Sequence, residues 1–526
     1  MAATEETPSR IAALLSRISP VPAFPQYTGP FKVGSVDAEV PVDSLESPAP
    51  TPAKAENIAT VQFRVFYPAV DESEEKRISW LPKPRRQHVS AYTQFVGLGP
   101  WLSDFLAFLP RHLYCTSIPV HSNARLRQPE ANSRWPTVIF SHGLGGSRHM
   151  YSYIAGSLAS HGIVVFCPEH RDGSAVVSHV RHSDSRSSRQ AVRYVQLSHK
   201  ADPGVYRARE AQLRIRLWEL GLVHDAVLAM DDGRDLHSLD PSTPDLKQFA
   251  GQLDVQEPGR IIFAGHSFGA ATIYQLLKCV YYAGHPSLSA MAEPLFAPGR
   301  DSSICKQITE RTVTMLLDMW CLPLLAPDSA PLLALPLPAY ADVPTAPGGK
   351  ALLAVESHAF YKWTSHLHSK ALLLSPEPSA RVVTAAMYER PSGVRLPEPN
   401  FFYVVKSAHL SQSDFGILFP WLSSKIFSAE EPERALRLNL RAQLQLLRAN
   451  GFAVARTSAS DLVDGPQTES KTGVDDDEAI LDRGEYEVVD HWRRIDIVGL
   501  GDKRPVGESE EQLEVELDDQ APASHL

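Results

Sequence analysis

This 526-residue chain has few cysteines, no long apolar runs and, outside its C-terminal segment, no large excess of charge of one sign. Each of these features excludes a class of protein. The five cysteines are odd in number, widely spaced and never arranged as C-x-x-C, which argues against a zinc site and favours a reducing compartment. No apolar run approaches the roughly 18–20 residues that span a bilayer. The N-terminus opens with acidic residues and has one short apolar stretch, a poor secretory signal. We therefore expect an intracellular, cytoplasmic protein without a transmembrane segment.

The net charge of −10 arises from an excess of acidic residues at the C-terminal end of the chain. Residues 461–526 carry 20 acidic and 6 basic residues, whereas the preceding 460 residues carry 41 acidic and 45 basic ones. A nucleic-acid binder would more often concentrate basic residues on a folded face. The nearest candidate, residues 181–200, is rich in serine and lacks helical or strand periodicity, so we expect a solvated loop and no nucleic-acid partner.

Short apolar runs alternate with helical stretches, a pattern typical of an α/β fold with a mostly parallel sheet flanked by helices. Strands are expected at residues 61–67, 137–140, 164–167, 260–264, 313–317, 352–355 and, as the last strand, 401–405. The longest helix, expected over residues 207–230, places Leu213, Leu217, Leu220 and Val227 on one face and stops before Gly233.

The chain divides into three expected parts: a flexible segment over residues 1–24, a catalytic domain over 25–455 and an acidic, largely disordered tail over 456–526. Within the tail, residues 486–498 could become ordered on a partner that the sequence does not identify. Two Pro-rich or irregular insertions, at residues 284–308 and 323–349, are expected to be surface excursions or lids without regular helix.

The sharpest local signal is the sequence Gly265-His266-Ser267-Phe268-Gly269, which lies between an expected strand and an expected helix over residues 270–279. G-x-S-x-G alone is common by chance, but strand, sharp turn and helix together are what a nucleophile elbow requires. We therefore expect Ser267 to be a nucleophile at a helix N-terminus, and His266 to be a packed neighbour of it.

A serine nucleophile needs a base that an acid orients, and in α/β-hydrolases these follow in the order Ser, acid, His. Asp318 ends an apolar strand, whereas Asp301, Asp328, Asp342 and Glu377 lie in Pro- or Ser-rich loops; the alternative role for Asp318 is a strand-ending cap. His409 follows the strand at 401–405 and is the expected base. His366 and His368, with strand-like spacing, are expected to be surface histidines rather than metal ligands, and no metal or cofactor is expected.

An oxyanion hole needs two backbone donors. One is expected to be the amide of Phe268, which follows the nucleophile. The second should come from the glycine-rich stretch Ser141-His142-Gly143-Leu144-Gly145-Gly146 after an earlier strand, and we nominate Leu144.

With these residues assembled, the chain resembles the platelet-activating-factor acetylhydrolase family, which includes lipoprotein-associated phospholipase A2. The resemblance covers roughly residues 25–425 and rests on residues 138–146 (VIFSHGLGG), 265–272 (GHSFGAAT), 317–320 (LDMW) and 407–415 (SAHLSQSDF). It implies an α/β-hydrolase fold with Ser267, Asp318 and His409 as the triad and with Phe268 and Leu144 as oxyanion donors. The chain departs from the secreted members in three ways: it lacks a persuasive signal peptide, it has the Pro-rich insertion after Pro323, and it has an acidic extension.

The activity that the resemblance implies is calcium-independent hydrolysis of the sn-2 acetyl or short acyl ester of platelet-activating factor and related phospholipids, by a serine esterase. A general carboxylesterase acting on soluble esters and a non-catalytic lipid-binding scaffold are the alternatives. An apolar patch of Trp101, Phe105, Leu106, Phe108 and Leu109 is expected either to touch a membrane surface transiently or to pack as core. The final Ser524-His525-Leu526 fits a peroxisomal address or is coincidental.

Overall fold

The structure is a computed structural model that describes residues 24–95, 111–181, 189–289, 291–427, 429–465, 472–482 and 488–501. The expected lipid-surface patch (Trp101, Phe105, Leu106, Phe108 and Leu109) and the C-terminal tripeptide (Ser524-His525-Leu526) lie outside these residues. Among the helices described, none has both the length and the apolar character needed to cross a bilayer.

One large sheet organises the described chain, with strand order β15-β14-β13-β12-β11-β6-β7-β2-β1-β5. The strands are β1 (Val33–Pro41), β2 (Thr60–Pro68), β5 (His121–Ser122), β6 (Trp135–Ser141), β7 (Val164–Pro168), β11 (Ile261–His266), β12 (Thr314–Leu317), β13 (Leu352–Ser357), β14 (Asn400–Val404) and β15 (Trp492–Arg494). The six from β7 to β14 run parallel, and antiparallel pairs flank them at β7–β2, β2–β1 and β14–β15. In this order the chain forms an α/β-hydrolase fold, as expected.

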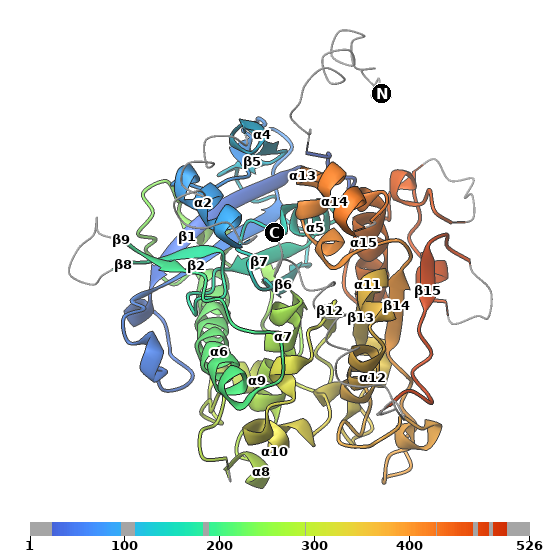
Figure 1. The fold of residues 1–526 in the computed structure, drawn as a ribbon. Coiled ribbons are helices and arrows are strands. Elements are labelled where there is room, and N and C mark those ends of the chain that lie inside the picture. Colours follow the sequence, from blue (N-terminus) through green and yellow to red (C-terminus); the bar gives the residue numbers. More distant parts are fainter. Residues whose placement is uncertain are drawn as a thin grey trace.

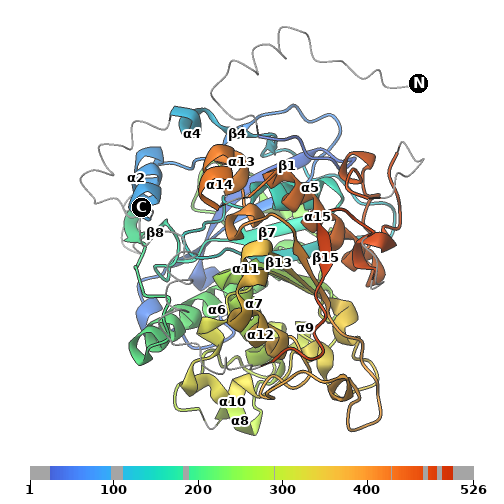
Figure 2. The same cartoon turned by 45° about the vertical axis from the view of Figure 1, so that its right-hand side comes forward.

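Helices cover both faces of this sheet (Figures 1 and 2). Helices α5 (Ser152–Ser160) and α15 (Pro432–Ala449) pack on one face, and α6 (Pro203–Asp231), α7 (Phe268–Tyr281) and α12 (Thr364–Leu373) on the other. The remaining α-helices are α2 (Arg85–Phe95), α4 (Arg111–Cys115), α8 (Pro286–Ser289), α9 (Ser303–Gln307), α10 (Ala330–Leu333), α11 (His358–Lys362), α13 (Phe415–Leu418) and α14 (Pro420–Phe427). Each face therefore buries its own apolar core.

Helix α6 shows how local sequence sets an element that later supports the site. Asp202 caps it by accepting hydrogen bonds from the amides of Gly204 (2.7 Å) and Val205, and proline occupies the first helical position. Gly233 follows the helix at φ +68°, a conformation that favours glycine. The four residues predicted to share its apolar face are all buried: Leu213, Leu217, Leu220 and Val227.

The structure corrects several sequence-based expectations. Within residues 181–200, where a solvated loop was expected, residues 189–193 (β9, Arg189–Arg193) pair antiparallel with β8 (Val177–Arg181), and Arg181 and Arg189 both pair with Glu39. His366 and His368 lie on helix α12 and are buried, because the chain turns back over the sheet there. The two insertions contain short helices, among them α8, α9 and α10.

The catalytic domain was expected to end at residue 455, but the parts of the tail that the structure describes pack against it. Strand β15 adds to the sheet beside β14, so the strand at 401–405 is not the last one. The Arg441 side chain of α15 makes two hydrogen bonds to Asp477 (2.7 and 2.9 Å), and both groups are buried. Paired charges and added backbone hydrogen bonds hold these segments although their composition is acidic.

Candidate active site

Ser267 stands at the turn between β11 and α7 with a strained backbone, at φ +55° and ψ −120°. A non-glycine residue in such a conformation costs on the order of 1–3 kcal/mol, and the surrounding structure must enforce it. The Ser267 amide donates to the Leu317 carbonyl (2.9 Å), and the Trp320 amide donates to the Ser267 carbonyl (3.3 Å). These bonds tie the turn to the end of β12, where Asp318 follows.

The two glycines of the elbow are required by close backbone approach. A Cβ atom on Gly269 would lie 2.1 Å from the Ser141 carbonyl oxygen, and one on Gly265 would lie 2.6 Å from the Gly269 backbone. Gly143 faces Ser267 in the same way, because an added Cβ would meet the Ser267 Cβ at 2.9 Å. The loop after β6 is therefore packed directly against the serine.

The imidazole of His409 and the carboxylate of Asp318 form a hydrogen-bonded pair, with Nδ1 3.0 Å from Oδ2. His409 begins a short 3₁₀ turn (His409–Gln412) after β14, and Asp318 follows β12 with φ +42°. The other carboxylate oxygen accepts the Ser357 amide (2.6 Å). Asp318 is completely buried, whereas 18% of the His409 side chain is exposed, so the pair has one solvent-facing end.

Aromatic rings hold His409 in place. The Phe360 ring stacks on it with centroids 4.3 Å apart and planes at 3°. The His266 ring lies on it at 4.5 Å, and His266 Nε2 is 3.2 Å from the His409 carbonyl. His266 precedes Ser267 in the chain, so these contacts bring His409 beside the serine. His266 Nδ1 also bonds the Tyr151 hydroxyl (2.8 Å), which confirms it as a packed, hydrogen-bonded neighbour.

A second buried charge pair lies behind the acid. Lys370 of α12 forms an ion pair with Glu356 of β13, and both are buried. Burial raises the pKa of Glu356 to about 8 and that of Asp318 to about 6, while the Lys370 charge opposes both shifts. Burial, and then the Lys370 charge, lower the pKa of His409 to about 3. His409 is therefore neutral near pH 7, as a proton acceptor must be.

The two nominated oxyanion donors differ from their neighbours in hydrogen bonding. In the loop after β6, the Gly143 amide donates to the Tyr151 hydroxyl (3.0 Å), that of Gly145 to the Ser174 carbonyl (2.8 Å) and that of Gly146 to the Gly143 carbonyl (3.2 Å). Within the described residues, the amide of Leu144 donates to no protein group, and neither does that of Phe268 at the start of α7. Both are available to a developing negative charge.

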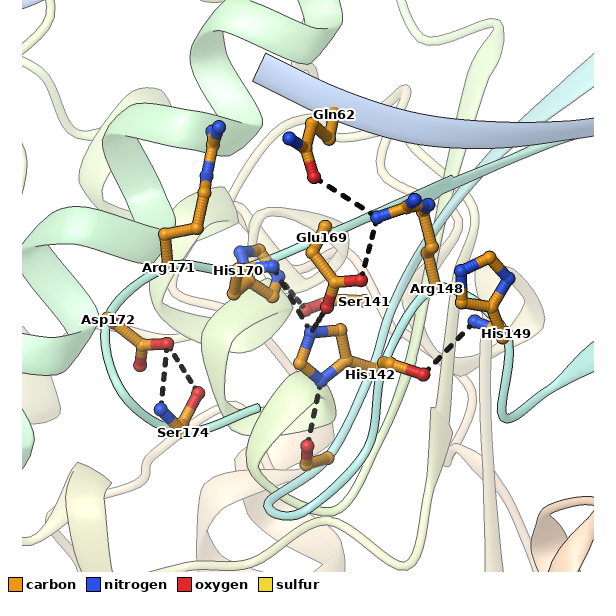
Figure 3. A network of polar contacts seen from close by, with 12 residues as sticks. Gln62, Ser141, His142, Arg148, His149, Glu169, His170, Arg171, Asp172 and Ser174 are labelled. Atoms are coloured by element: carbon orange, nitrogen blue, oxygen red, sulfur yellow. Dashed lines mark hydrogen bonds and ion pairs between the residues drawn. The ribbon is translucent and has the colours of Figure 1, made fainter. Parts of the chain in front are cut away.

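A buried polar network supports this loop from behind (Figure 3). His142 Nδ1 bonds the Gly143 carbonyl (2.8 Å), and its Nε2 accepts the His170 amide (3.2 Å). The Glu169 carboxylate lies 3.5 Å from the same Nε2 and also pairs with Arg148 (3.0 Å). The loop is thus fixed by the buried side chains of His142 and Glu169, while Arg148 is partly exposed.

The same network contains a second serine, histidine and acid in sequence. Ser141 Oγ is 2.9 Å from His170 Nε2, and His170 Nδ1 is 3.0 Å from Glu219 Oε2. Ser141 and His170 are completely buried, so a substrate carbonyl has no route to them. This group therefore has a structural role, and Ser267 with the partly exposed His409 is the better candidate for chemistry.

His266, Asp318 and His409 also place ligand atoms within 4.8 Å of one another, a geometry that a metal ion would accept. Both nitrogens of His266 already bond protein groups, and Nδ1 of His409 bonds Asp318. A cation would have to displace these bonds. The donor arrangement fits an acid–base pair better than a metal centre.

The structure brings Asp318 and His409 into contact, and His266, which precedes Ser267, lies against His409. Phe268 follows Ser267 in the chain, and Leu144 follows Gly143, which packs against Ser267. Sequence reasoning missed the supporting groups Phe360, Lys370, Glu356, Tyr151 and Asp414. Asp414 accepts hydrogen bonds from the Trp80 indole (2.8 Å) and from the amides of Ser152 and Tyr153 (both 2.9 Å), so it ties the His409 turn to α5. Asp414 is part of the SAHLSQSDF motif at residues 407–415. The other four supporting residues have no local sequence signal.

Several known proteins are similar to this chain in sequence. A protein of Schizosaccharomyces pombe named "Putative phospholipase A2" is 29% identical over 443 residues, covering 81% of this chain and 92% of that protein. Platelet-activating factor acetylhydrolases of dog (Canis lupus familiaris) and cattle (Bos taurus) are 30% and 32% identical over 219 and 217 residues. Each of these two matches covers 41% of this chain and 46% of the relative, so the chain spans about half the length of these mammalian proteins.

Among solved structures, a ferulic acid esterase from Streptomyces cinnamoneus aligns over 81% of this chain and 91% of its own, at a TM-score of 0.39 and 16% identity. A sequence model of the family described as "Platelet-activating factor acetylhydrolase, isoform II" matches residues 17–330. Because that match covers more than half of the chain, the protein belongs to the platelet-activating factor acetylhydrolase isoform II family.

Proposed function

We propose that this family member, a hydrolase, is a serine esterase that cleaves the sn-2 acetyl or short-chain acyl ester of platelet-activating factor and related phospholipids without calcium. The observation that carries the proposal is the hydrogen bond between His409 and Asp318 beside a strained serine at a helix N-terminus. The names of the mammalian relatives support the substrate class, and the yeast relative's name supports a phospholipase activity.

The reaction follows from this geometry. Ser267 Oγ attacks the acyl carbon while His409 Nε2 takes the hydroxyl proton, and Asp318 holds the Nδ1 proton and stabilises the imidazolium. The oxyanion receives hydrogen bonds from the Phe268 and Leu144 amides. Collapse breaks the sn-2 ester bond, and His409 returns the proton to the leaving alcohol. Water then attacks the acyl-enzyme with His409 as base, which releases the carboxylic acid and restores Ser267.

Transient contact with a lipid surface is part of this proposal. The ring of Phe95, the last residue of α2, lies against Gly145 of the oxyanion loop, where an added Cβ would meet it at 2.5 Å. The apolar sequence with Trp101 and Phe105 follows Phe95 directly in the chain. Replacing Phe105 and Phe108 by serine should weaken sedimentation with phosphatidylcholine vesicles and leave turnover of a soluble acetate ester intact; unchanged sedimentation would assign these side chains to the core.

A substrate panel tests the main proposal. Phosphocholines with an sn-2 acyl chain of graded length should be compared with p-nitrophenyl acetate, in the presence of EGTA. We expect Ser267-dependent turnover with the highest kcat/KM on acetyl and short chains and no loss with EGTA. A higher kcat/KM on the soluble ester would favour the general carboxylesterase, and absence of turnover in the folded protein would favour the scaffold.

A further inference from the structure

Arg216, in the middle of α6, is a completely buried cation whose hydrogen bonds converge on the oxyanion loop. Its Nη1 donates to the His142 carbonyl (2.8 Å), and its Nη2 donates to the Ser174 hydroxyl (2.6 Å). Its Nε lies 3.1 Å from the Asp172 carboxylate, which supplies the countercharge. Of these partners, His142 belongs to the loop itself, and Ser174 holds Gly145 of that loop through its carbonyl.

The same guanidinium also touches the helix that carries the other donor. It stacks over the Phe268 ring, 4.5 Å from the centroid, and Nη1 reaches Thr272 Oγ1 at 3.4 Å. One rigid, planar group therefore contacts the segment that presents the Leu144 amide and the residue that presents the second amide. A planar guanidinium with five fixed donors can hold several elements at set positions, which a lysine ammonium cannot reproduce.

We propose that Arg216 is a positioning residue that sets the separation and direction of the Leu144 and Phe268 amides, and so stabilises the transition state without touching substrate. This inference rests on the proposed serine esterase function. Donor alignment matters because a donor is effective only at hydrogen-bond distance from the place where the oxyanion forms, and removal of one donor costs about 10²–10³ in kcat.

Arg209 on the same helix provides a matched control. It is also completely buried, and its guanidinium also faces the Phe268 ring, at 5.8 Å. Its hydrogen bonds go to Gln212 (2.9 Å), to the Leu197 carbonyl (3.4 Å) and to the Tyr194 side chain, and none of those in the described structure goes to the oxyanion loop. Replacing either arginine by lysine removes a buried guanidinium from one helix and keeps a positive charge there, but only the replacement of Arg216 releases the loop.

The test compares Arg216→Lys with Arg209→Lys in the full chain, using a short-chain ester and a trifluoromethyl ketone that the serine converts to a tetrahedral adduct. Active enzyme is counted by fluorophosphonate labelling, so that an unfolded fraction does not enter kcat. For Arg216→Lys we expect kcat to fall about 10²-fold with KM within about threefold, and the ketone to bind weaker by the same factor as kcat/KM falls. Arg209→Lys should keep kcat within about threefold.

Ser174→Ala is a milder second variant, in case Arg216→Lys does not fold. It removes the hydroxyl that the guanidinium bonds but keeps the charge, and we expect a roughly tenfold loss of kcat with KM unchanged. Equal losses in the Arg216 and Arg209 variants, or unchanged kcat per labelled site in the Arg216 and Ser174 variants, would overturn the inference. Turnover that survives in Ser267→Ala would instead overturn the proposed function, so the two failures are distinguishable.

Discussion

Replacing Asp318 by asparagine should reverse the hydrogen bond between residue 318 and His409 Nδ1 while leaving the fold in place. The Ser357 amide donates to one side-chain oxygen of Asp318 at 2.6 Å, and an asparagine would keep its carbonyl there. Its NH₂ group would then face His409 Nδ1, where Asp318 Oδ2 now lies at 3.0 Å. His409 would have to accept at Nδ1 and carry its proton on Nε2. In that tautomer Nε2 cannot take a proton from Ser267.

The expected loss in kcat/KM is about 10⁴-fold, by analogy with the same change in a serine protease, which corresponds to about 5.4 kcal/mol of transition-state stabilisation. Stability should not fall, because burial already raises the pKa of Asp318 and disfavours its charge. The assay is kcat/KM on a short-chain ester together with the urea midpoint of unfolding. Asp328→Asn, an identical change at an exposed site, is the control. A loss below tenfold in Asp318→Asn, or a large loss in Asp328→Asn, would refute the assignment.

Three further outcomes follow from the same site. Ser267→Ala should abolish both ester turnover and fluorophosphonate labelling, and labelling that persists would show that Ser267 is not the nucleophile. The acid limb of kcat/KM, measured from about pH 4 to pH 9, should lie near pH 6, below the usual histidine value. The pKa of His409 is lowered to about 3, so the limb reports Asp318, whose pKa is raised to about 6 and which must be ionised to accept the hydrogen bond from the Nδ1–H group of His409. A limb at or above pH 7 would contradict this. Asp414→Ala should lower the free energy of unfolding by at least about 3 kcal/mol, because three buried N–H donors lose their acceptor at about 1–3 kcal/mol each; an unchanged urea midpoint would show that these donors find other partners.

The sequence predicted those parts of the molecule that local patterns determine. Apolar runs between turns identified the six parallel strands. The elbow and the acid follow their strands directly, and the base follows its strand after a short turn. Carboxyl ends of parallel strands meet at one edge of a sheet, so residues far apart in the chain could be brought together by reasoning. The contact between Asp318 and His409 is the outcome of that geometry.

The supporting residues could not be predicted, because their roles depend on which helix faces which strand. Lys370 looks like a surface lysine in sequence, yet α12 buries it against Glu356. His366 has strand-like spacing to His368, but it accepts the Cys321 amide (3.0 Å) from within a helix. β15 lies in an acidic segment, and its pairing with β14 depends on a register that composition does not reveal.

The two groups of buried charge that support the site act on different steps, and this separates them experimentally. Helices α6 and α12 cover the same face of the sheet (Figure 1), yet Arg216 bonds the oxyanion loop, whereas Lys370 lies behind the acid and base. Loss of Arg216 should lower the plateau of kcat without moving its acid limb. The paired change Lys370→Met with Glu356→Gln leaves no unpaired buried charge and removes the positive charge that lowers the pKa of both His409 and Asp318. It should move the acid limb to higher pH and leave the plateau nearly intact. If both sets of variants lowered the plateau alike, the two charge groups would serve packing rather than separate catalytic steps.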